Sequence, residues 1–348
     1  MNRRIAALSL LSLAASGPAL AQMLSDQAPP QHRIVHRNLL ALRANPLGAG
    51  WEGRFAYRYR LYASESIALR DNFLGLGIAP GLTPTYARLG LYAEAQPTTF
   101  LGFWAIYEAM QYFGDFNQLQ SFPFARVDFS DLALKAYPPG YPAFGTLFTF
   151  GVNVNLRFGK IIVRDVFKVV RPDFGLRRND TVFYEQLSDL LLPNRRVTLI
   201  NDLDVLYQAP LDGLFVGLRY SVGDPIYGIE NGVAENSTHR LGPICAYRFF
   251  DHDGRRFNQP TVAVVVNWYL KHPYRTGQET PTAIPYFALA FQTSGDFLPL
   301  DPAPTKPVEA PPAPEAPASS PAPTPSPTPI EPEPVDGGTL PSDAPPQQ

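Results

Sequence analysis

Apolar and polar residues alternate along much of the chain, most clearly in residues 148–158. In Phe-Thr-Phe-Gly-Val-Asn-Val-Asn-Leu-Arg-Phe every second residue is apolar, and the residues between are small or polar. Because successive side chains of a β-strand point to opposite faces, this segment predicts a strand with one hydrocarbon face and one wet face. A soluble sheet can carry the same pattern, so repetition and context must decide.

Comparable segments recur along the chain. Alternation is clear in residues 51–61, 87–96, 197–208, 214–222, 240–249, 262–271 and 287–291. It is weaker in residues 100–112, 126–137, 160–171 and 181–191. With residues 148–158 the pattern predicts about twelve strands, in a range of about 10 to 14, because segments of about ten alternating residues separated by turns are typical of transmembrane barrels.

The connections between the segments differ in length. The shorter ones are residues 97–99, 138–141, 171–180, 210–213 and 251–256, and the long ones are residues 64–83, 113–125, 223–238 and 272–282. If the first strand starts in the periplasm, the shorter set is periplasmic and the long set is external, as in outer-membrane barrels. Tight turns at 159–160 and 193–195 would fall outside, against the trend. We therefore predict an all-β, transmembrane, antiparallel up-and-down β-barrel over residues 51–293.

The start of the chain reads as an export signal. Arg3 and Arg4 precede an apolar run over residues 5–15, and Ala19-Leu20-Ala21 is a small-residue cleavage site. An uncleaved anchor is the alternative, but the run is short of the roughly 20 residues that a spanning helix needs. We expect a signal peptide over 1–21, cleaved near Ala21. Residues 22–50 then form a periplasmic segment, in which residues 34–42 could make a short amphipathic helix.

Residues 302–348 differ in composition from the rest. They hold 17 of the chain's 38 prolines and few apolar side chains. Such a segment cannot bury a core, so a disordered, polyproline-rich tail is predicted. After an even number of strands it would lie in the periplasm, where it could act as a spacer or bind a periplasmic partner.

Composition narrows the class further. The formal net charge is −2, and nothing indicates a nucleic-acid partner. Cys245 is the only cysteine, which excludes an internal disulfide, and it lies on an apolar strand face, where we expect it to be buried or to face lipid. The many aromatic residues suit the interfacial girdles of a barrel.

On these residues the chain resembles a bacterial outer-membrane β-barrel protein over about 51–293. Val182-Phe183-Tyr184, Leu191-Leu192-Pro193-Asn194 and Asn201-Asp202-Leu203-Asp204 are similar to barrels of an uncharacterised family. The strand 286–291 resembles the aromatic-ended strand that barrel-assembly machinery reads, although here it does not end the chain. The resemblance implies an outer-membrane location, with membrane lipid and the assembly machinery as partners.

The polar strand faces predict which side chains line the lumen. We expect these to be Arg54, Arg58, Arg60, Arg88, Glu94, Arg157, Asp202, Asp204, Arg219, Arg248 and Lys271. Because basic side chains outnumber acidic ones, an open lumen would be a narrow path or binding site for small anionic solutes. Alternatively these charges pair and fill a closed lumen, and the barrel has a structural or interaction role through its tail or outer loops.

Catalysis is the third hypothesis. Outer-membrane phospholipases use Ser, His and Asn on the barrel wall, and the nearest candidates here are Ser237 and His239. No third group is placed to orient the histidine, so we predict no enzyme.

Metal or cofactor binding is not predicted either. His252 between Asp251 and Asp253 reads better as a turn, and His32 and His36 lack a third ligand. Asp202 and Asp204 share one face, where salt bridges to arginines of the next strand are expected rather than a paired-carboxylate site.

Overall fold

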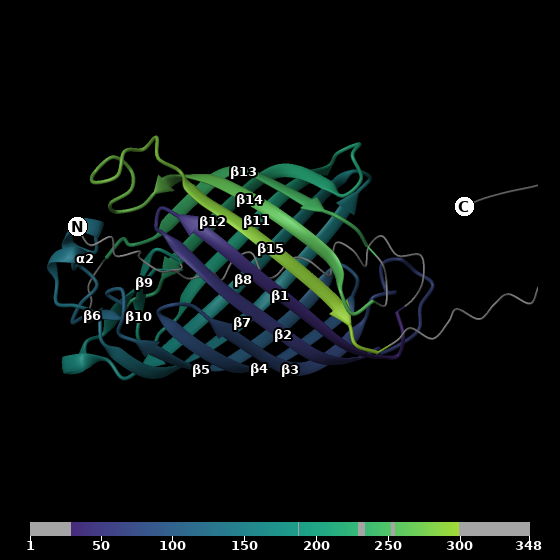
Figure 1. Cartoon of the computed structure of the whole chain (residues 1–348), viewed down its shortest axis with the longest axis horizontal. Coiled ribbons are helices and arrows are strands. Elements are labelled where there is room, and N and C mark those ends of the chain that lie inside the picture. The colour runs from purple at the N-terminus through teal and green to yellow at the C-terminus, as the bar shows by residue number, and fades with distance from the viewer. Residues whose placement is uncertain (1–28, 187, 229–233, 252–254, 299–348) are drawn as a thin grey trace, which may run out of the picture. The chain divides into compact units, whose positions relative to one another are not determined.

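Twelve strands close into one antiparallel barrel in the computed structural model (Figure 1), which describes residues 29–186, 188–228, 234–251 and 255–298. Each strand pairs with the barrel strands before and after it in the chain, and β1 pairs with β15 to complete the circle. The barrel strands are β1 (His32–Ala44), β2 (Gly48–Tyr59), β3 (Phe73–Leu82), β4 (Tyr86–Thr98), β5 (Leu101–Phe113), β7 (Pro142–Phe158), β8 (Ile161–Phe174), β11 (Thr198–Gln208), β12 (Leu214–Pro225), β13 (Thr238–Arg248), β14 (Asn258–Lys271) and β15 (Tyr286–Asp296).

Large apolar side chains cover the outward face of the barrel. Leu76 on β3 is 67% exposed and Leu91 on β4 is 68% exposed. On both strands the alternate residues, which point inward, are mostly buried. Cys245 also lies on the exposed face of β13. Water-soluble proteins rarely expose a continuous apolar surface, and a closed barrel satisfies its own backbone hydrogen bonds in lipid. The predicted transmembrane antiparallel barrel is therefore confirmed.

The predicted number of strands is right, but two assignments are wrong. Residues 126–137 contain no strand; they include helix α2 (Asp131–Ala136), which Ser130 caps by accepting a hydrogen bond from the backbone N–H of Ala133. Residues 181–191 contribute to a small separate sheet that is not part of the barrel wall. The two remaining strands of the wall are β1 and β3, which the sequence pattern did not predict.

The sequence hides β1 and β3 for different reasons. β1 is apolar on both faces around Leu39 and Ala41, because its inner face packs into an apolar cluster that includes Ile244 and Val265. β3 carries small residues on its inner face, where neighbouring side chains leave no room. A Cβ at Gly75 would lie 2.6 Å from Cγ of Glu94.

The domain boundaries shift accordingly. The barrel runs from His32 to Asp296 rather than over 51–293, and most of 22–50 belongs to its first strand and first turn instead of a periplasmic segment. The predicted signal peptide and the tail at 302–348 lie outside the described residues.

The two ends of the barrel differ in their connections. At one end of the barrel β1 begins and β15 ends, and we call it the termini end for this reason. It carries the connections 60–72, 99–100, 159–160, 209–213 and 249–257. The loop end carries the connections 45–47, 83–85, 114–141, 175–197, 226–237 and 272–285.

This arrangement corrects three predicted connections. Residues 138–141 and 171–180 lie at the loop end, not with the short turns, and 64–83 is not one long outer loop because half of it is β3. The turn at 159–160, predicted to break the rule, lies with the short turns.

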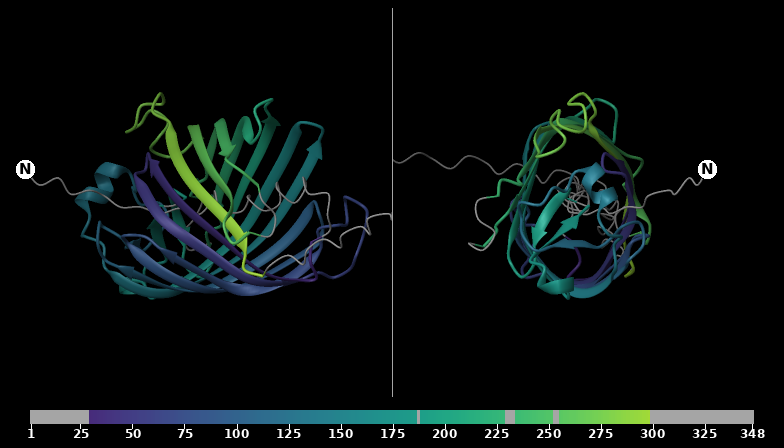
Figure 2. Two further views of the ribbon diagram at one scale, coloured as in Figure 1. Left: turned by 45° about the vertical axis from the view of Figure 1, so that its right-hand side comes forward. Right: turned by 90° about the vertical axis from the view of Figure 1, so that its left-hand side faces the viewer.

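A cap forms at the loop end from three short strands and α2. Strands β6 (Gln120–Phe122), β9 (Val182–Glu185) and β10 (Leu190–Pro193) pair in the order β10-β9-β6. Figure 2 shows this sheet and α2 inside the outline of the barrel. One apolar cluster joins Phe183 and Leu190 to Phe174 of the wall, and another joins Val182 and Leu191 to the segment around α2. Because both faces are buried, residues 181–191 do not alternate.

The described residues contain little helix besides α2 and a 3-10 turn, η2 (Arg177–Asn179). None of the helices in these ranges has the length and apolar character needed to cross a bilayer.

Candidate functional site

The side chains predicted to line the lumen divide between the interior and the rims. Arg54, Arg58, Arg88, Glu94, Asp202, Asp204 and Arg219 contact other inward residues of the wall. The other four lie at the ends of the barrel. Arg60 donates to the carbonyl of Pro29, Arg157 donates to Gln208, Arg248 pairs with Asp251, and Lys271 is exposed 3.8 Å from Glu235.

Most interior charges form cross-strand ion pairs. Arg58 pairs with Glu94 at 2.6 Å, and Lys168 pairs with Asp202 at 3.2 Å. Arg88 lies between two carboxylates, Glu52 and Glu108. Buried charges need such partners because removal from water costs several kcal/mol per ion. These pairs fill part of the lumen, and their carboxylates are already bound to basic side chains.

Asp204 is shared between two arginines. Arg219 on β12 reaches its carboxylate through two hydrogen bonds of 2.7 and 2.9 Å, and Arg164 on β8 lies 2.6 Å from the same carboxylate. One negative charge therefore balances two buried positive charges, and Arg164 retains a buried Nε with no hydrogen-bond partner.

Arg37 and Arg54 have no carboxylate partner among the described residues. They face each other in the register of β1 and β2. Arg37 is 9% exposed, donates to the side chain of Gln292 at 3.0 Å and has an unpartnered Nε. The guanidinium of Arg54 lies 4.7 Å from the ring centroid of Trp104, a cation–π contact. Arg164 projects into the lumen from β8, which lies on the opposite wall from β1. We call Arg37, Arg54 and Arg164 the central arginine cluster.

Two hollows lie beside these charges. A hollow of about 80 Å³ is lined by Arg164, Arg219 and Gln292, with apolar side chains opposite. A second hollow of about 70 Å³ lies below the cap, beside Lys168 and Arg240. Each hollow has room for several waters or a small ion.

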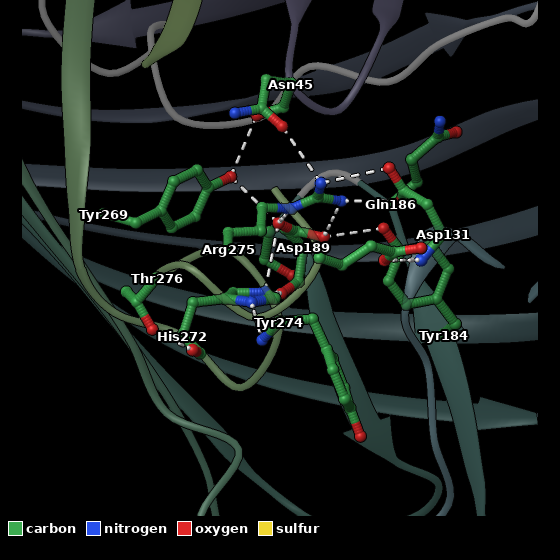
Figure 3. A network of polar contacts seen from close by, with 12 residues as sticks. Asn45, Asp131, Tyr184, Gln186, Asp189, Tyr269, His272, Tyr274, Arg275 and Thr276 are labelled. Atoms are coloured by element: carbon green, nitrogen blue, oxygen red, sulfur yellow. Dashed lines mark hydrogen bonds and ion pairs between the residues drawn. The ribbon is translucent and has the colours of Figure 1, made fainter. Parts of the chain in front are cut away.

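Asp189 holds the cap to the wall through a buried polar network (Figure 3). Its carboxylate accepts hydrogen bonds from Tyr184 of β9 at 2.7 Å and from Tyr269 of β14 at 2.9 Å. Arg275 donates to both carboxylate oxygens, and Nε2 of His272 lies 3.2 Å from one of them. We call this network the latch.

Arg275 extends the latch to two further elements. It donates to the side chain of Asn45 in the β1–β2 turn at 3.0 Å, and it pairs with Asp131 at the start of α2 at 3.0 Å. Beside it, the side chain of Gln186 donates to the carbonyl of Leu47 at 3.0 Å. The latch therefore joins both parts of the cap to the wall.

Asp189 and Arg275 of the latch are charged under all ordinary conditions. Burial raises the pKa of Asp189, but the charges of Arg275 and His272 and their hydrogen bonds outweigh it and hold that pKa well below 3.8. Burial and the Asp189 charge raise the pKa of Tyr184, so its hydroxyl remains a donor. Burial lowers the pKa of Arg275, yet Asp189 more than compensates and raises it.

The candidate catalytic pair is not assembled. Ser237 is buried, and no hydrogen bond connects it with His239 in the described part of the chain. Nδ1 of His239 instead lies 2.7 Å from the hydroxyl of Tyr220 on the neighbouring strand.

The candidate metal ligands do not converge either. His32 and His36 lie on a strand, not a helix, and contact Tyr57 and the backbone of Arg256. Asp202 and Asp204 each engage basic partners, and His252 and Asp253 lie outside the described residues. Within those residues no three His, Cys, Asp or Glu side chains gather.

Sequence reasoning missed Arg37 and Arg164 in the central cluster, and Asp189 and Arg275 in the latch. Arg33, Arg37 and Arg43 are separated by even numbers of residues, as expected for one face of a strand. Leu39 and Ala41 on that same face are apolar, so β1 shows no clear alternation of polar and apolar residues. No signal in the sequence pairs Asp189 with Arg275, which lie 86 residues apart.

The architecture and the polar interior define a bacterial outer-membrane β-barrel protein. No protein family and no curated protein matches the chain. Among solved structures, CdiB from Acinetobacter baumannii shares 9% identity over 77% of this chain and 61% of that one, with a TM-score of 0.37. This chain thus spans about three fifths of the CdiB structure.

Two autotransporter barrels are similar at the same level. The translocator domain of NalP from Neisseria meningitidis shares 11% identity over 79% of this chain and 91% of that one, with a TM-score of 0.35. The beta domain of Brka from Bordetella shares 8% over 77% and 100%, with a TM-score of 0.40. We draw no functional conclusion from likenesses this weak, and the assignment rests on the strand pairing and the apolar exterior.

Proposed function

We propose that the protein is a narrow outer-membrane channel that prefers small anions. The central arginine cluster is the observation that carries the proposal. Three guanidinium groups project into the same lumen, and the only carboxylate in ion-pair contact with any of them in the described residues is Asp204, which is shared with Arg219. A positive, low-dielectric constriction concentrates anions and excludes cations.

The orientation follows from the lengths of the connections. Outer-membrane barrels place short turns in the periplasm and long loops outside. The termini end would then be periplasmic, and the cap would restrict the external entrance. A tail at 302–348 would begin on the periplasmic side, where it could bind a partner.

The size of the passage favours small solutes. The hollows beside the central cluster and beneath the cap have volumes of about 80 and 70 Å³. Chloride or a short carboxylate fits this scale, whereas a sugar would require the cap to move. We expect the latch to keep the resting conductance low.

Charge reversal inside the lumen tests the proposal. Arg54→Glu and Arg164→Glu should each shift the reversal potential in a potassium chloride gradient towards cations, measured in planar bilayers. Lys135→Glu, an exposed change on α2, is the matched control and should leave selectivity unchanged. Heat-modifiable migration on a denaturing gel would establish that each variant folds. Selectivity that stays the same in both lumen variants would contradict the proposal.

A closed structural or interaction barrel is the second candidate, favoured by the ion pairs that fill the interior. The two are separated by weakening the latch. If a folded Asp189→Asn variant never conducts, the lumen has no passable route, and the structural role is the better account.

A further inference from the structure

Arginine side chains gather at the loop end, around the tip of β8 and the connection that follows it. All are exposed to solvent. The group, which we call the rim arginine patch, comprises Arg171, Arg177, Arg178, Arg195 and Arg196.

The returning segment is held beside β8 by backbone pairing. The N–H of Arg195 donates to the carbonyl of Pro172 at 2.7 Å. The side chain of Asn194 bonds to both the N–H and the carbonyl of Phe174, at 2.8 and 2.9 Å. Arg195 and Arg196 are therefore fixed next to Arg171 although they lie more than twenty positions later in the sequence.

The turn at η2 brings two further arginines to the same rim. The guanidinium of Arg177 lies 3.7 Å from the ring centroid of Tyr141, and the backbone N–H of Arg177 donates to the hydroxyl of that tyrosine at 2.9 Å. Arg178 has a left-handed backbone with φ of 52°, which is uncommon for a residue with a Cβ. The turn keeps both side chains at the surface.

Nearby acids only partly balance the patch. Asp173 pairs with Arg195 at 2.8 Å, but both side chains are exposed, at 41% and 68%. Exposed pairs of this kind contribute little to stability and are readily exchanged for another anion. Asp180 accepts a hydrogen bond from Ser121 at 2.5 Å. The five arginines of the patch outnumber these two aspartates.

The patch lies at the level of the membrane border. Arg171 lies three residues before the end of β8 at the loop end, and its register partner on β7, Phe148, is exposed on the outward face. Phe144, closer to the loop end, is 60% exposed. Outward aromatic residues mark the interfaces of a transmembrane barrel, so Arg171 is placed where lipid headgroups lie.

We propose that the rim arginine patch binds the phosphate of a lipid headgroup in the leaflet at the loop end. Guanidinium groups bind phosphate oxygens in bidentate pairs, and several of them can surround one phosphate. A surface hollow of about 450 Å³, lined by Arg195 and Arg196 and also by Asp180, adjoins the patch. This inference does not depend on whether the lumen conducts.

Lipid retention measured by native mass spectrometry tests the inference. The full chain in detergent would be incubated with diphosphorylated lipid A and, separately, with its dephosphorylated form. We expect binding of the phosphorylated lipid only. The triple variant Arg171→Gln, Arg195→Gln, Arg196→Gln should lose roughly tenfold or more of this binding. The double variant Arg126→Gln, Lys135→Gln, with exposed charges elsewhere at the loop end, should retain it.

Three outcomes would overturn the inference. Equal binding of the dephosphorylated lipid would show that phosphate is not recognised. Equal retention by the triple variant would show that the patch is not the site. Displacement of the lipid by an equal concentration of inorganic phosphate would show a free-phosphate site instead. Heat-modifiable migration of the triple variant establishes that loss of binding is not loss of fold.

Discussion

At the residue scale, the molecule concentrates its unusual chemistry in a few arginines and one aspartate. Arg37 and Arg164 are buried with hydrogen-bond donors left unpartnered, a costly arrangement in a lumen that could have been filled with apolar side chains. Asp189 is the opposite case, since both of its carboxylate oxygens accept hydrogen bonds. The first arrangement suits an anion pathway, and the second suits a fixed structural joint.

Asp189→Asn should release the cap. The change removes the charge that balances buried Arg275, and breaking a buried pair in this way costs about 3 kcal/mol or more. We expect faster tryptic cleavage after Lys135 on α2 and a higher conductance in planar bilayers. Asp212→Asn, in an exposed turn at the termini end, is the matched control. A variant that is cleaved at the same rate as the natural protein would show that the latch does not hold the cap.

The latch should also be insensitive to moderate acid. The pKa of Asp189 is lowered on folding, so its contribution is complete above about 3.8 and is lost only as the pH falls through the lower folded value. Tryptic cleavage after Lys135, corrected for the pH dependence of trypsin on an unfolded peptide, should be equal at pH 8 and pH 5. Faster cleavage at pH 5 would mean that another group controls the cap.

At the element scale, the sequence predicts strands well where lipid and water oppose each other across the wall. β2, β7 and β14 alternate cleanly because their inner faces are largely polar or small. β1 and β3 could not be recognised, since their inner faces contact an apolar cluster or are glycine-rich. Residues 181–191 show the converse, because a sheet buried inside the barrel has no polar face to reveal it.

Glycines in the wall make a testable case of this packing. A Cβ at Gly77 of β3 would lie 1.9 Å from the carbonyl oxygen of Phe55 on β2, so Gly77→Ala must displace one strand. We expect a loss of about 1–3 kcal/mol, seen as a lower urea midpoint for the heat-modifiable form. Gly102→Ala, whose Cβ would meet no atom closer than 3.8 Å, is the control. Equal midpoints for the two variants would argue against the described β2–β3 pairing.

At the scale of the whole molecule, the number of strands could be predicted although two assignments were exchanged. A closed barrel needs every strand paired, and an even number returns the chain to the end where it began. The polar inner face of most strands was also predictable. The placement of Arg37 and Arg164 on opposite walls of one lumen was not, because sequence spacing carries no information on which strands face each other.

The reversal potential of single channels tests the central claim most directly. The natural chain and its Asp189→Asn variant would be recorded in a planar bilayer with a tenfold gradient of potassium chloride. The account predicts rare or small openings for the natural chain, more frequent openings for the variant, and a potential in both that is displaced towards the chloride equilibrium value. A potential displaced towards potassium would contradict a lumen governed by arginine.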